Sequence, residues 1–141
     1  MSLISDILFR KTSIPVLQRS LDASALRHRV IANNLANIST PNYRRKEVSF
    51  EEELGKATIT SAIQGITTNP KHLPLGRKEV FQAEPVQFEP EDASDKSGIN
   101  NVDIDQEMAE LAKNQVYYTY AARLLTRNFN ALRASIRGRA T

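Results

Sequence analysis

The side chains that could catalyse a reaction or hold a metal ion are few and scattered in this 141-residue chain. His28 and His72 lie far apart, and neither has a histidine or cysteine partner at the spacing of a metal site. The run Glu51–Glu53 has no base or nucleophile nearby, so it indicates the solvated start of a short helix. Nucleophile elbows, phosphate loops and triad-like groupings are absent from the sequence. We therefore predict a protein that is not an enzyme and uses no cofactor, metal ion or small-molecule substrate.

Two clusters have the residue types that bind nucleic acid. They are the basic run Arg44–Lys46 and the tyrosine-rich run Tyr117–Tyr120 beside Arg123. However, Tyr118 falls on an apolar helical seam, and the arginines near the C-terminus lie where a helix dipole favours them. The formal net charge of +3 is also mild. A soluble helical adaptor or a nucleic-acid-binding module therefore remains the alternative to a structural function.

The composition suits long helices better than a sandwich or barrel. Aromatic residues make up 6% of the chain, tryptophan and cysteine are absent, and there are five glycines. The first residues, "MSLISDILFRKTSIPVL", lack the basic, apolar and small-residue regions of a cleaved secretory leader. We expect that any export of this protein uses a route that cleaves no signal peptide.

Near the N-terminus, apolar or small residues recur at alternating steps of three and four, the spacing of a heptad seam. Ser13 is placed to cap the helix start, and Pro15 is tolerated in the first turn. Pro41 ends the helix, and Asn42 suits a left-handed turn. We predict a helix over residues 14–38, about 38 Å long. The seam comprises Ile14, Leu17, Leu21, Ser24, His28, Ile31, Leu35 and Ile38.

The C-terminal pattern is longer and more regular. Asp103 followed by Gln106 forms a capping-box sequence, and Gly138 marks the end. We predict a helix over residues 104–136, about 50 Å long. Its seam comprises Ile104, Met108, Leu111, Gln115, Tyr118, Ala122, Leu125, Phe129, Leu132 and Ile136.

The middle of the chain has no convincing period, and we expect it to be irregular or short-stranded. Val48 and Phe50 indicate a short extended piece, and an apolar cluster occurs near the N-terminus, within residues 3–8. Isolated apolar residues could dock or pair as short strands, namely Ile63, Leu73, Val80, Phe81, Val86 and Phe88. The predicted organisation is an N-terminal helical segment (1–40), a turn and irregular middle (41–100) and a C-terminal helix (101–138). The two helical parts form one discontinuous core domain.

Pairing the two seams with each other leaves further apolar residues in water. These flanking rows include Leu26 and Val30 on the first helix and Val116 and Leu124 on the second. A helix pair of this size is marginal as a monomer. The sequence therefore predicts that other subunits bury the flanking rows.

Three asparagines at the end of the first helix are unexpected there. Asn33, Asn34 and Asn37 together cost roughly 1.5–2 kcal/mol of helix propensity relative to alanine. Amides buried between helices can hydrogen-bond and penalise a slipped register, as a seam asparagine does in coiled coils. We interpret the three residues as determinants of register between subunits.

The motif "IANNLANISTPNYRR" followed by "VSFEEEL" resembles the N-terminal signature of bacterial flagellar rod and hook proteins. The segment "GINNVDIDQEMAELAKNQVYYTYAARLLTRNFNALRASI" is similar to their C-terminal helix. The short chain and the phrase "TTNPKHLPLG" look most like a proximal rod subunit. The family usually has glycine where this chain has Asn42, and asparagine adopts the same backbone shape at modest cost.

This resemblance implies a mainly α-helical protein whose terminal helices form a coiled-coil-like pair and stack into a helical tube. It implies a structural subunit of the flagellar rod, located in the periplasm above the inner-membrane ring and needed for motility. Its partners would be copies of itself, other rod proteins, the ring-to-rod adaptor, the inner-membrane ring and the type III export apparatus. Nucleic acid is not among the expected partners.

The expected assembly residues lie at the two ends of the motif just described. They are Asn33, Asn34, Leu35, Asn37, Thr40, Pro41, Asn42 and Tyr43 at the first helix end, and Asn101, Val102, Asp103 and Met108 at the second helix start.

Overall fold

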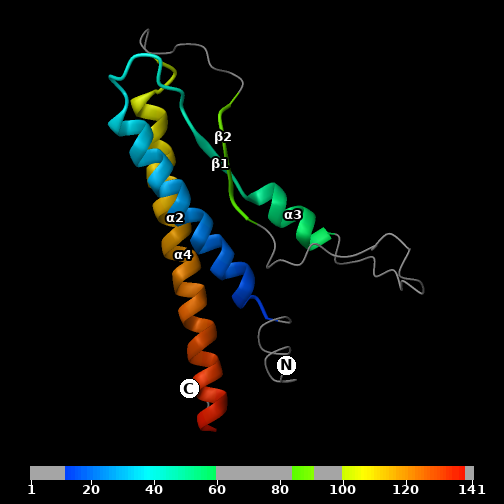
Figure 1. Ribbon diagram of the computed structural model, residues 1–141. Coiled ribbons are helices and arrows are strands. Elements are labelled where there is room, and N and C mark those ends of the chain that lie inside the picture. The colour runs from blue at the N-terminus through cyan, green and yellow to red at the C-terminus, as the bar shows by residue number, and fades with distance from the viewer. Residues whose placement is uncertain (1–11, 60–83, 91–99, 139–141) are drawn as a thin grey trace, which may run out of the picture.

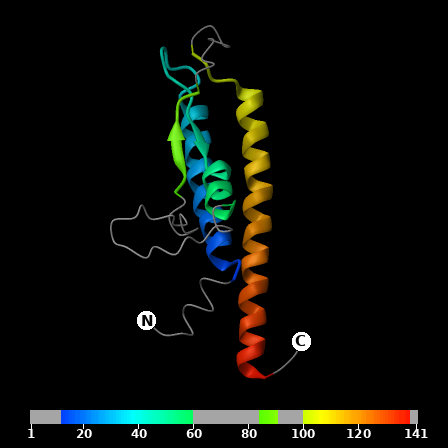
Figure 2. The same ribbon diagram turned by 90° about the vertical axis from the view of Figure 1, so that its right-hand side faces the viewer.

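Two long helices lie side by side and run in opposite directions in the computed structural model, which describes residues 12–59, 84–90 and 100–138 (Figures 1 and 2). They are α2 (Ile14–Ala36) and α4 (Ile104–Arg137). Asn100 binds the backbone at the end of α2, and Asn128 binds Ser13 at its start, which makes the pair antiparallel. This arrangement confirms the predicted helical fold with long terminal helices and a short-stranded middle.

Helix α2 follows its predicted bounds within two residues. Ser13 occupies the N-cap position without a capping hydrogen bond from its side chain, because its hydroxyl accepts from Asn128 Nδ2 at 3.0 Å. The helix ends at the cap residue Asn37, and the chain then turns at Asn42, whose φ of 60° is left-handed. The prediction that Asn42 adopts this conformation is therefore confirmed.

Helix α4 is capped at both ends by the residues that the sequence indicates. Asp103 accepts hydrogen bonds from the amides of Asp105 and Gln106 at 2.9 and 3.3 Å. Gly138 adopts φ 65°, a conformation that costs residues with a Cβ about 1–2 kcal/mol. Because Asn128 lies beside Ser13, residues 129–137 extend past the start of α2 (Figure 2).

The middle of the chain contributes an arm that consists of β1 (Glu47–Ser49), α3 (Glu51–Ile59) and β2 (Val86–Phe88). The two strands pair antiparallel, with Glu47 opposite Phe88 and Ser49 opposite Val86. The predicted extended piece and the pairing of Val86 and Phe88 are confirmed, as is the helix start at Glu51. Helix α3 continues to Ile59 after three acidic residues that favour its first turn, so the middle of the chain also contains a helix of nine residues.

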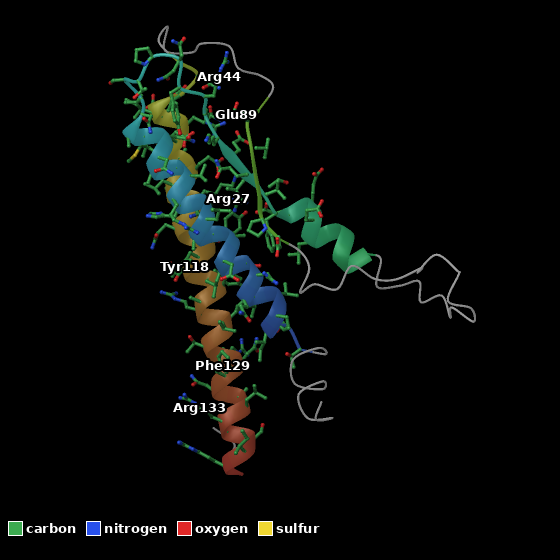
Figure 3. All side chains as sticks on the ribbon, viewed as in Figure 1. Arg27, Arg44, Glu89, Tyr118, Phe129 and Arg133 are labelled. Carbon is green, nitrogen blue, oxygen red and sulfur yellow. The ribbon has the colours of Figure 1, made fainter. Side chains whose placement is uncertain are left out.

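The apolar core is small and lies mainly between α2 and the arm. Ala23 and Phe50 are buried against each other, and Leu54 packs on them. Val30 and Val48 are buried nearby. Most of α4 faces solvent on the other side of α2, and its side chains stand out from the helix in Figure 3. In the part of the chain that the structure describes, no helix is long and apolar enough to cross a bilayer.

Several residues considered from the sequence lie outside the described ranges. They are the apolar cluster within residues 3–8, and Ile63, His72, Leu73, Val80 and Phe81.

Candidate functional site

Helix α4 packs on α2 through a row of mostly polar residues spaced by seven. We call Asn100, Glu107, Asn114, Ala121 and Asn128 the polar row. The first four are 1%, 0%, 3% and 8% exposed, and Asn128 is half-buried. Residues seven apart lie on nearly the same face of a helix. The contact between the two long helices is therefore built on polar and small side chains.

Asn100 donates hydrogen bonds to backbone carbonyl groups at and just after the end of α2. Its Nδ2 lies 3.1, 2.8 and 3.1 Å from the carbonyl oxygens of Asn37, Ile38 and Thr40. The last carbonyls of a helix have no partner within the helix, so a side-chain donor at this point stabilises the turn. This contact ties the turn after α2 to the residues that precede α4.

Asn114 joins the middle of the two helices. Its Nδ2 donates to the Ser24 carbonyl at 3.0 Å, while its Oδ1 is buried without a hydrogen-bond partner among the described residues. A buried acceptor without a partner costs roughly 1–3 kcal/mol, so this residue is retained at a cost in stability. Such a cost is consistent with a role in fixing the register of the pair.

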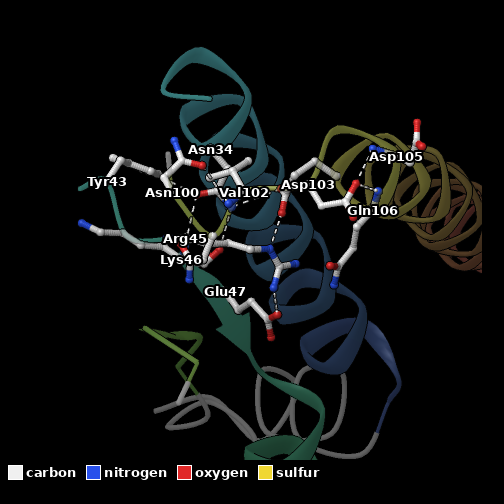
Figure 4. Close-up of polar contacts among 12 residues, drawn as sticks. Asn34, Tyr43, Arg45, Lys46, Glu47, Asn100, Val102, Asp103, Asp105 and Gln106 are labelled. Atoms are coloured by element: carbon white, nitrogen blue, oxygen red, sulfur yellow. Dashed lines mark hydrogen bonds and ion pairs between the residues drawn. The ribbon is translucent and has the colours of Figure 1, made fainter. Parts of the chain in front are cut away.

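A second cluster of buried polar groups connects α2, α4 and the chain leading into β1. We call Asn34, Tyr43, Arg45 and Glu107 the hub (Figure 4). Asn34 Nδ2 donates to Glu107 Oε2 at 3.1 Å, and Arg45 Nε donates to Glu107 Oε1 at 2.5 Å. Tyr43 donates its hydroxyl proton to Asn34 Oδ1 at 3.1 Å. One buried carboxylate therefore holds both α2 and the chain entering the arm.

Asn34 also pairs with the backbone of Lys46 in the manner of a strand neighbour. Its Nδ2 donates to the Lys46 carbonyl at 2.8 Å, and its Oδ1 accepts from the Lys46 amide at 3.1 Å. Alanine at position 34 would leave these buried groups without partners. The asparagine therefore fixes how the chain leaves the turn relative to α2.

The charges of the hub compensate one another. Burial disfavours the charged form of Arg45, but hydrogen bonds and negative charges from Glu107 and Glu47 outweigh burial and raise the pKa of Arg45. Burial, followed by the charges of Glu107 and Glu89, raises the pKa of the Tyr43 phenol. Arg45 therefore stays protonated and Tyr43 stays a neutral hydrogen-bond donor near neutral pH.

The three asparagines of α2 have three different environments. Asn34 is 0% exposed and belongs to the hub. Asn37 bonds locally, since its Nδ2 donates to the Asn33 carbonyl at 2.8 Å and its Oδ1 accepts from the Thr40 hydroxyl at 3.2 Å. The Asn33 side chain is exposed. Of these three asparagines, only Asn34 is buried between helices in the described part of the chain.

The other expected assembly residues separate into buried and exposed groups. Asn101 is buried, and its Oδ1 accepts from the Arg45 amide at 2.7 Å. Val102 is 1% exposed. Leu35, Tyr43 and Asp103 are half-buried, while Thr40, Pro41, Asn42 and Met108 are exposed. The structure thus brings the end of α2 and the residues that precede α4 together at the turn.

The expected pairing of the two heptad seams is wrong for α4. Exposed members of its seam form what we call the apolar stripe, with the following exposed fractions: Ile104 54%, Met108 52%, Tyr118 44%, Phe129 44% and Ile136 84%. The polar row takes the face toward α2 because its amides and carboxylate reach backbone and side-chain partners there. The apolar stripe is left on the neighbouring face of α4.

The seam of α2 is buried or half-buried except at one position, with Leu17, Leu21, Leu35 and Ile38 half-buried. Ile14, Ser24 and Ile31 are buried, whereas His28 is exposed. The predicted flanking rows also differ from expectation. Val30 is buried, while Val116 is 69% exposed. The remaining flanking residues, Leu26 and Leu124, are half-buried.

The sequence reading missed Glu107, Arg45, Asn100 and Asn114 as contact residues. Glu107 lies in the first turn of α4, where the helix dipole also favours an acid, and Arg45 belongs to the basic run Arg44–Lys46. The available signal was the spacing of seven from Asn100 through Glu107 and Asn114 to Asn128. Polar residues at this spacing usually mark a solvated helix face. The spacing alone therefore did not predict that the polar row is buried against α2.

A groove of about 370 Å³ between α2, β1 and α4 has the right size for a small ligand, but its charges are already compensated. Arg27 pairs with Glu51 at 2.8 Å, and Lys113 pairs with Glu110 at 3.2 Å. Among the described residues, no group of three or more histidine, cysteine or acidic side chains is arranged to hold a metal ion. The exposed stripe of α4 is therefore the stronger candidate for a functional surface.

Comparisons with known proteins identify the family. A family model described as "Flagella basal body rod protein" matches residues 15–44. The flagellar basal body rod protein FlgB of Bacillus subtilis is 33% identical over 126 residues, which cover 89% of this chain and 94% of that protein. FlgB of Borrelia hermsii is 35% identical over 130 residues, with 89% and 96% covered. FlgB of Escherichia coli is 32% identical over 106 residues, with 72% and 75% covered. The chain belongs to the flagellar basal body rod protein family, as a FlgB-like structural subunit of the rod.

Proposed function

We propose that this protein builds the proximal rod by packing the apolar stripe of α4 against neighbouring rod subunits. The neighbours are copies of itself and other rod proteins, and the product is a helical tube. Its role is mechanical, and it catalyses no reaction. The rod it forms transmits rotation across the periplasm for motility.

The observation that carries this proposal is the exposure of the apolar stripe after the helix pair has formed. Met108 is 52% exposed and Tyr118 is 44% exposed, although both belong to the apolar seam. Large exposed apolar surfaces on soluble proteins usually mark contacts with a partner. Because α2 already occupies the polar row, the partner of the stripe is another subunit.

In this proposal the expected assembly residues have two roles: some hold the fold of the subunit, and others contact neighbouring subunits. Asn34, Tyr43, Asn101, Val102 and Asp103 hold the helix pair and the turn in one arrangement. The exposed members then present contacts to neighbours, namely Asn33, Thr40, Pro41, Asn42 and Met108. Leu35 and Asn37 support the helix end between the two groups.

The proposed domain organisation follows the same division. Residues 1–40 and 101–138 form one discontinuous core domain, and residues 41–100 form the turn and the arm. The antiparallel contact of α2 with α4 supports this organisation. In the rod, the core domain forms the inner layer and the arm points outward.

Family membership supports a proposal on the location and further partners of the protein. We propose that the subunit leaves the cytoplasm through the flagellar type III export apparatus without cleavage of a signal peptide. In the periplasm it joins the rod base through the ring-to-rod adaptor above the inner-membrane ring. Membership of the flagellar basal body rod protein family is what supports this proposal.

The proposal is tested by making the stripe polar. The Met108→Gln/Tyr118→Gln variant should fold and be exported, yet restore less than about a tenth of rod assembly and motility in a strain that lacks the native protein. The matched control is Ala109→Gln/Ala131→Gln, two exposed positions on another face of α4. Normal motility of the stripe variant would refute the proposal.

The adaptor or nucleic-acid alternative receives less support from the structure. Arg45 lies in the run that could bind phosphate, but it is 7% exposed and bound to Glu107. A buried, paired arginine is a poor phosphate contact. Phosphate-dependent binding that falls steeply with salt would revive this alternative.

A further inference from the structure

The last part of α4 carries a patch that combines apolar and cationic side chains. We call Phe129, Arg133, Ile136 and Arg137 the tail patch. Phe129 is 44% and Ile136 is 84% exposed, and both arginines are exposed. Positions spaced by four, seven and eight share one helix face. Between Asn114 and Gly138 the sequence has four arginines and no acidic residue, so this end of α4 is uniformly cationic.

The arm carries the complementary patch on β2. We call Glu84, Val86, Phe88 and Glu89 the arm patch. Val86 is 53% and Phe88 is 41% exposed, and both glutamates are exposed. Val86 and Phe88 share one face of the strand because their positions differ by two. Glu84 shares this face and precedes the apolar pair, while Glu89 follows it on the other face, toward Tyr43. Carboxylates therefore flank the apolar side chains at both ends of β2.

Further acidic residues surround this patch. Positions 47–55 and 84–90 contain no basic residue and six acidic ones: Glu47, Glu51, Glu52, Glu53, Glu84 and Glu89. Two of the six are paired within the chain, Glu47 with Arg45 and Glu51 with Arg27. One patch is thus apolar with positive flanks, and the other is apolar with negative flanks. Such a match favours association and penalises contact between like patches.

The two patches of one chain are held apart. The arm leaves α2 near Asn34, which binds Lys46 just before β1. The tail patch lies beyond Ser13, at the opposite end of α2 (Figures 1 and 2). Any contact between the patches therefore joins two separate molecules.

We propose that the tail patch of one subunit binds the arm patch of a second copy in the assembled rod. This inference rests on the proposed function and names the neighbouring surface for the end of the apolar stripe. The two patches differ, so the contact is heterologous and leaves one free patch at each end of a pair. A contact of this kind propagates into an open assembly, as a rod requires.

Cysteine cross-linking tests the contact directly, because the native chain contains no cysteine. The full-length Val86→Cys/Ile136→Cys variant keeps all four patch charges. Mild oxidation of the concentrated protein should give a ladder of disulfide-linked dimers, trimers and larger species. The control Val86→Cys/Ala131→Cys places the second thiol at an exposed position on the other side of α4. The control should cross-link at least about tenfold less, since disulfides need Cβ atoms about 4 Å apart.

A charge swap tests the chemistry of the contact. Adding Arg133→Glu/Arg137→Glu to the chain with Ile136→Cys should lower its cross-linking to a Val86→Cys chain about tenfold or more. Adding Glu84→Arg/Glu89→Arg to that Val86→Cys chain should restore the cross-link. Rescue of this kind distinguishes a direct charge contact from a loss of folding.

Four outcomes would overturn the inference. These are cross-linking no greater than in the control, a product that stops at the dimer, failure of the charge swap to restore the bond, and binding of the arginines to anionic phospholipid vesicles without any ladder. The proposed function fails separately, if the Met108→Gln/Tyr118→Gln variant builds normal rods. A missing ladder together with a defective stripe variant would remove this contact and leave the proposed function intact.

Discussion

The two ends of α4 differ in what they bury and what they expose. At the hub end, Glu107 and Asn34 are each 0% exposed, and their polar atoms bind one another, Arg45 and backbone groups. At the tail end, Ile136 is 84% exposed and Phe129 is 44% exposed. The usual distribution of polar and apolar side chains is therefore reversed along one helix.

This reversal separates two tasks that a polymer-forming subunit must perform. Polar contacts at the hub specify one arrangement of the helices and the turn, because a slipped register would leave buried groups unpaired. The apolar side chains near the tail are not buried within the single chain, so they remain available to contact neighbouring subunits. The isolated subunit is less stable as a result, and its apolar surface is buried only when neighbouring subunits pack against it.

The largest expected effect comes from removing the partner of the buried carboxylate. Arg45→Ala leaves Glu107, whose side chain is 0% exposed, without its counter-charge, and should destabilise the monomer by about 3–5 kcal/mol. Urea unfolding followed by circular dichroism measures this loss. The Arg45→Met/Glu107→Leu variant should recover most of the stability, because both charges are removed together. A loss below about 1 kcal/mol for Arg45→Ala would show that the hub does not hold the fold.

The adjacent asparagines provide a matched pair with a smaller effect. Asn34→Ala should lower the free energy of unfolding by about 1–3 kcal/mol, because the Lys46 amide and carbonyl lose their partner. Asn33→Ala, at an exposed position, should raise it by a few tenths, about 0.5 kcal/mol, through better helix propensity. Equal effects of the two variants would contradict the division between a buried and an exposed asparagine.

Tyr43 gives the hub a dependence on alkaline pH. Tyr43→Phe removes the hydrogen bond to Asn34 and should cost about 1 kcal/mol near neutral pH. Because burial and the charges of Glu107 and Glu89 raise the pKa of Tyr43, its contribution is present below the ordinary tyrosine pKa. The contribution is lost as the pH rises through the raised value. Unfolding measured from neutral to strongly alkaline pH should therefore show a steeper decline for the native chain than for Tyr43→Phe.

The smallest expected effect concerns the ion pair between α2 and α3. Burial opposes ionisation of Glu51, but backbone hydrogen bonding and the positive charge of Arg27 outweigh it and lower the pKa of Glu51. Its contribution is therefore present at neutral pH and lost as the pH falls through the lowered value. The Glu51 side chain is 70% exposed, so Glu51→Gln should cost less than about 1 kcal/mol. A larger loss that persists in high salt would show that this pair contributes more than solvent screening allows.

Local features of the fold were predictable because they depend on neighbouring residues. The caps at Asp103 and Gly138, the left-handed Asn42 and the strand at Val48 each follow from nearby residue types. Which face of each helix packs against the other helix was not predictable from neighbouring residues. An apolar seam indicates that a helix packs, but it does not distinguish a partner in the same chain from one in another subunit.

The hub is the clearest example of a contact that the sequence alone does not predict. Glu107 and Arg45 are 62 residues apart, and each has an ordinary local interpretation as a first-turn acid or as part of a basic run. Only the approach of α4 to the chain that follows α2 makes them partners. The burial of Glu107 could therefore be inferred only from its spacing of seven with Asn100 and Asn114, and Arg45 has no comparable spacing.

The central claim is that the polar row faces α2 in every state, whereas the apolar stripe becomes covered only in the rod. Thiol labelling of single-cysteine variants, Tyr118→Cys on the stripe and Ala121→Cys on the polar row, tests it most directly. Tyr118→Cys should react rapidly in the free subunit and slowly in isolated basal bodies, while Ala121→Cys should react slowly in both. Equal reactivity of Tyr118→Cys in the free subunit and in the basal body would contradict the account.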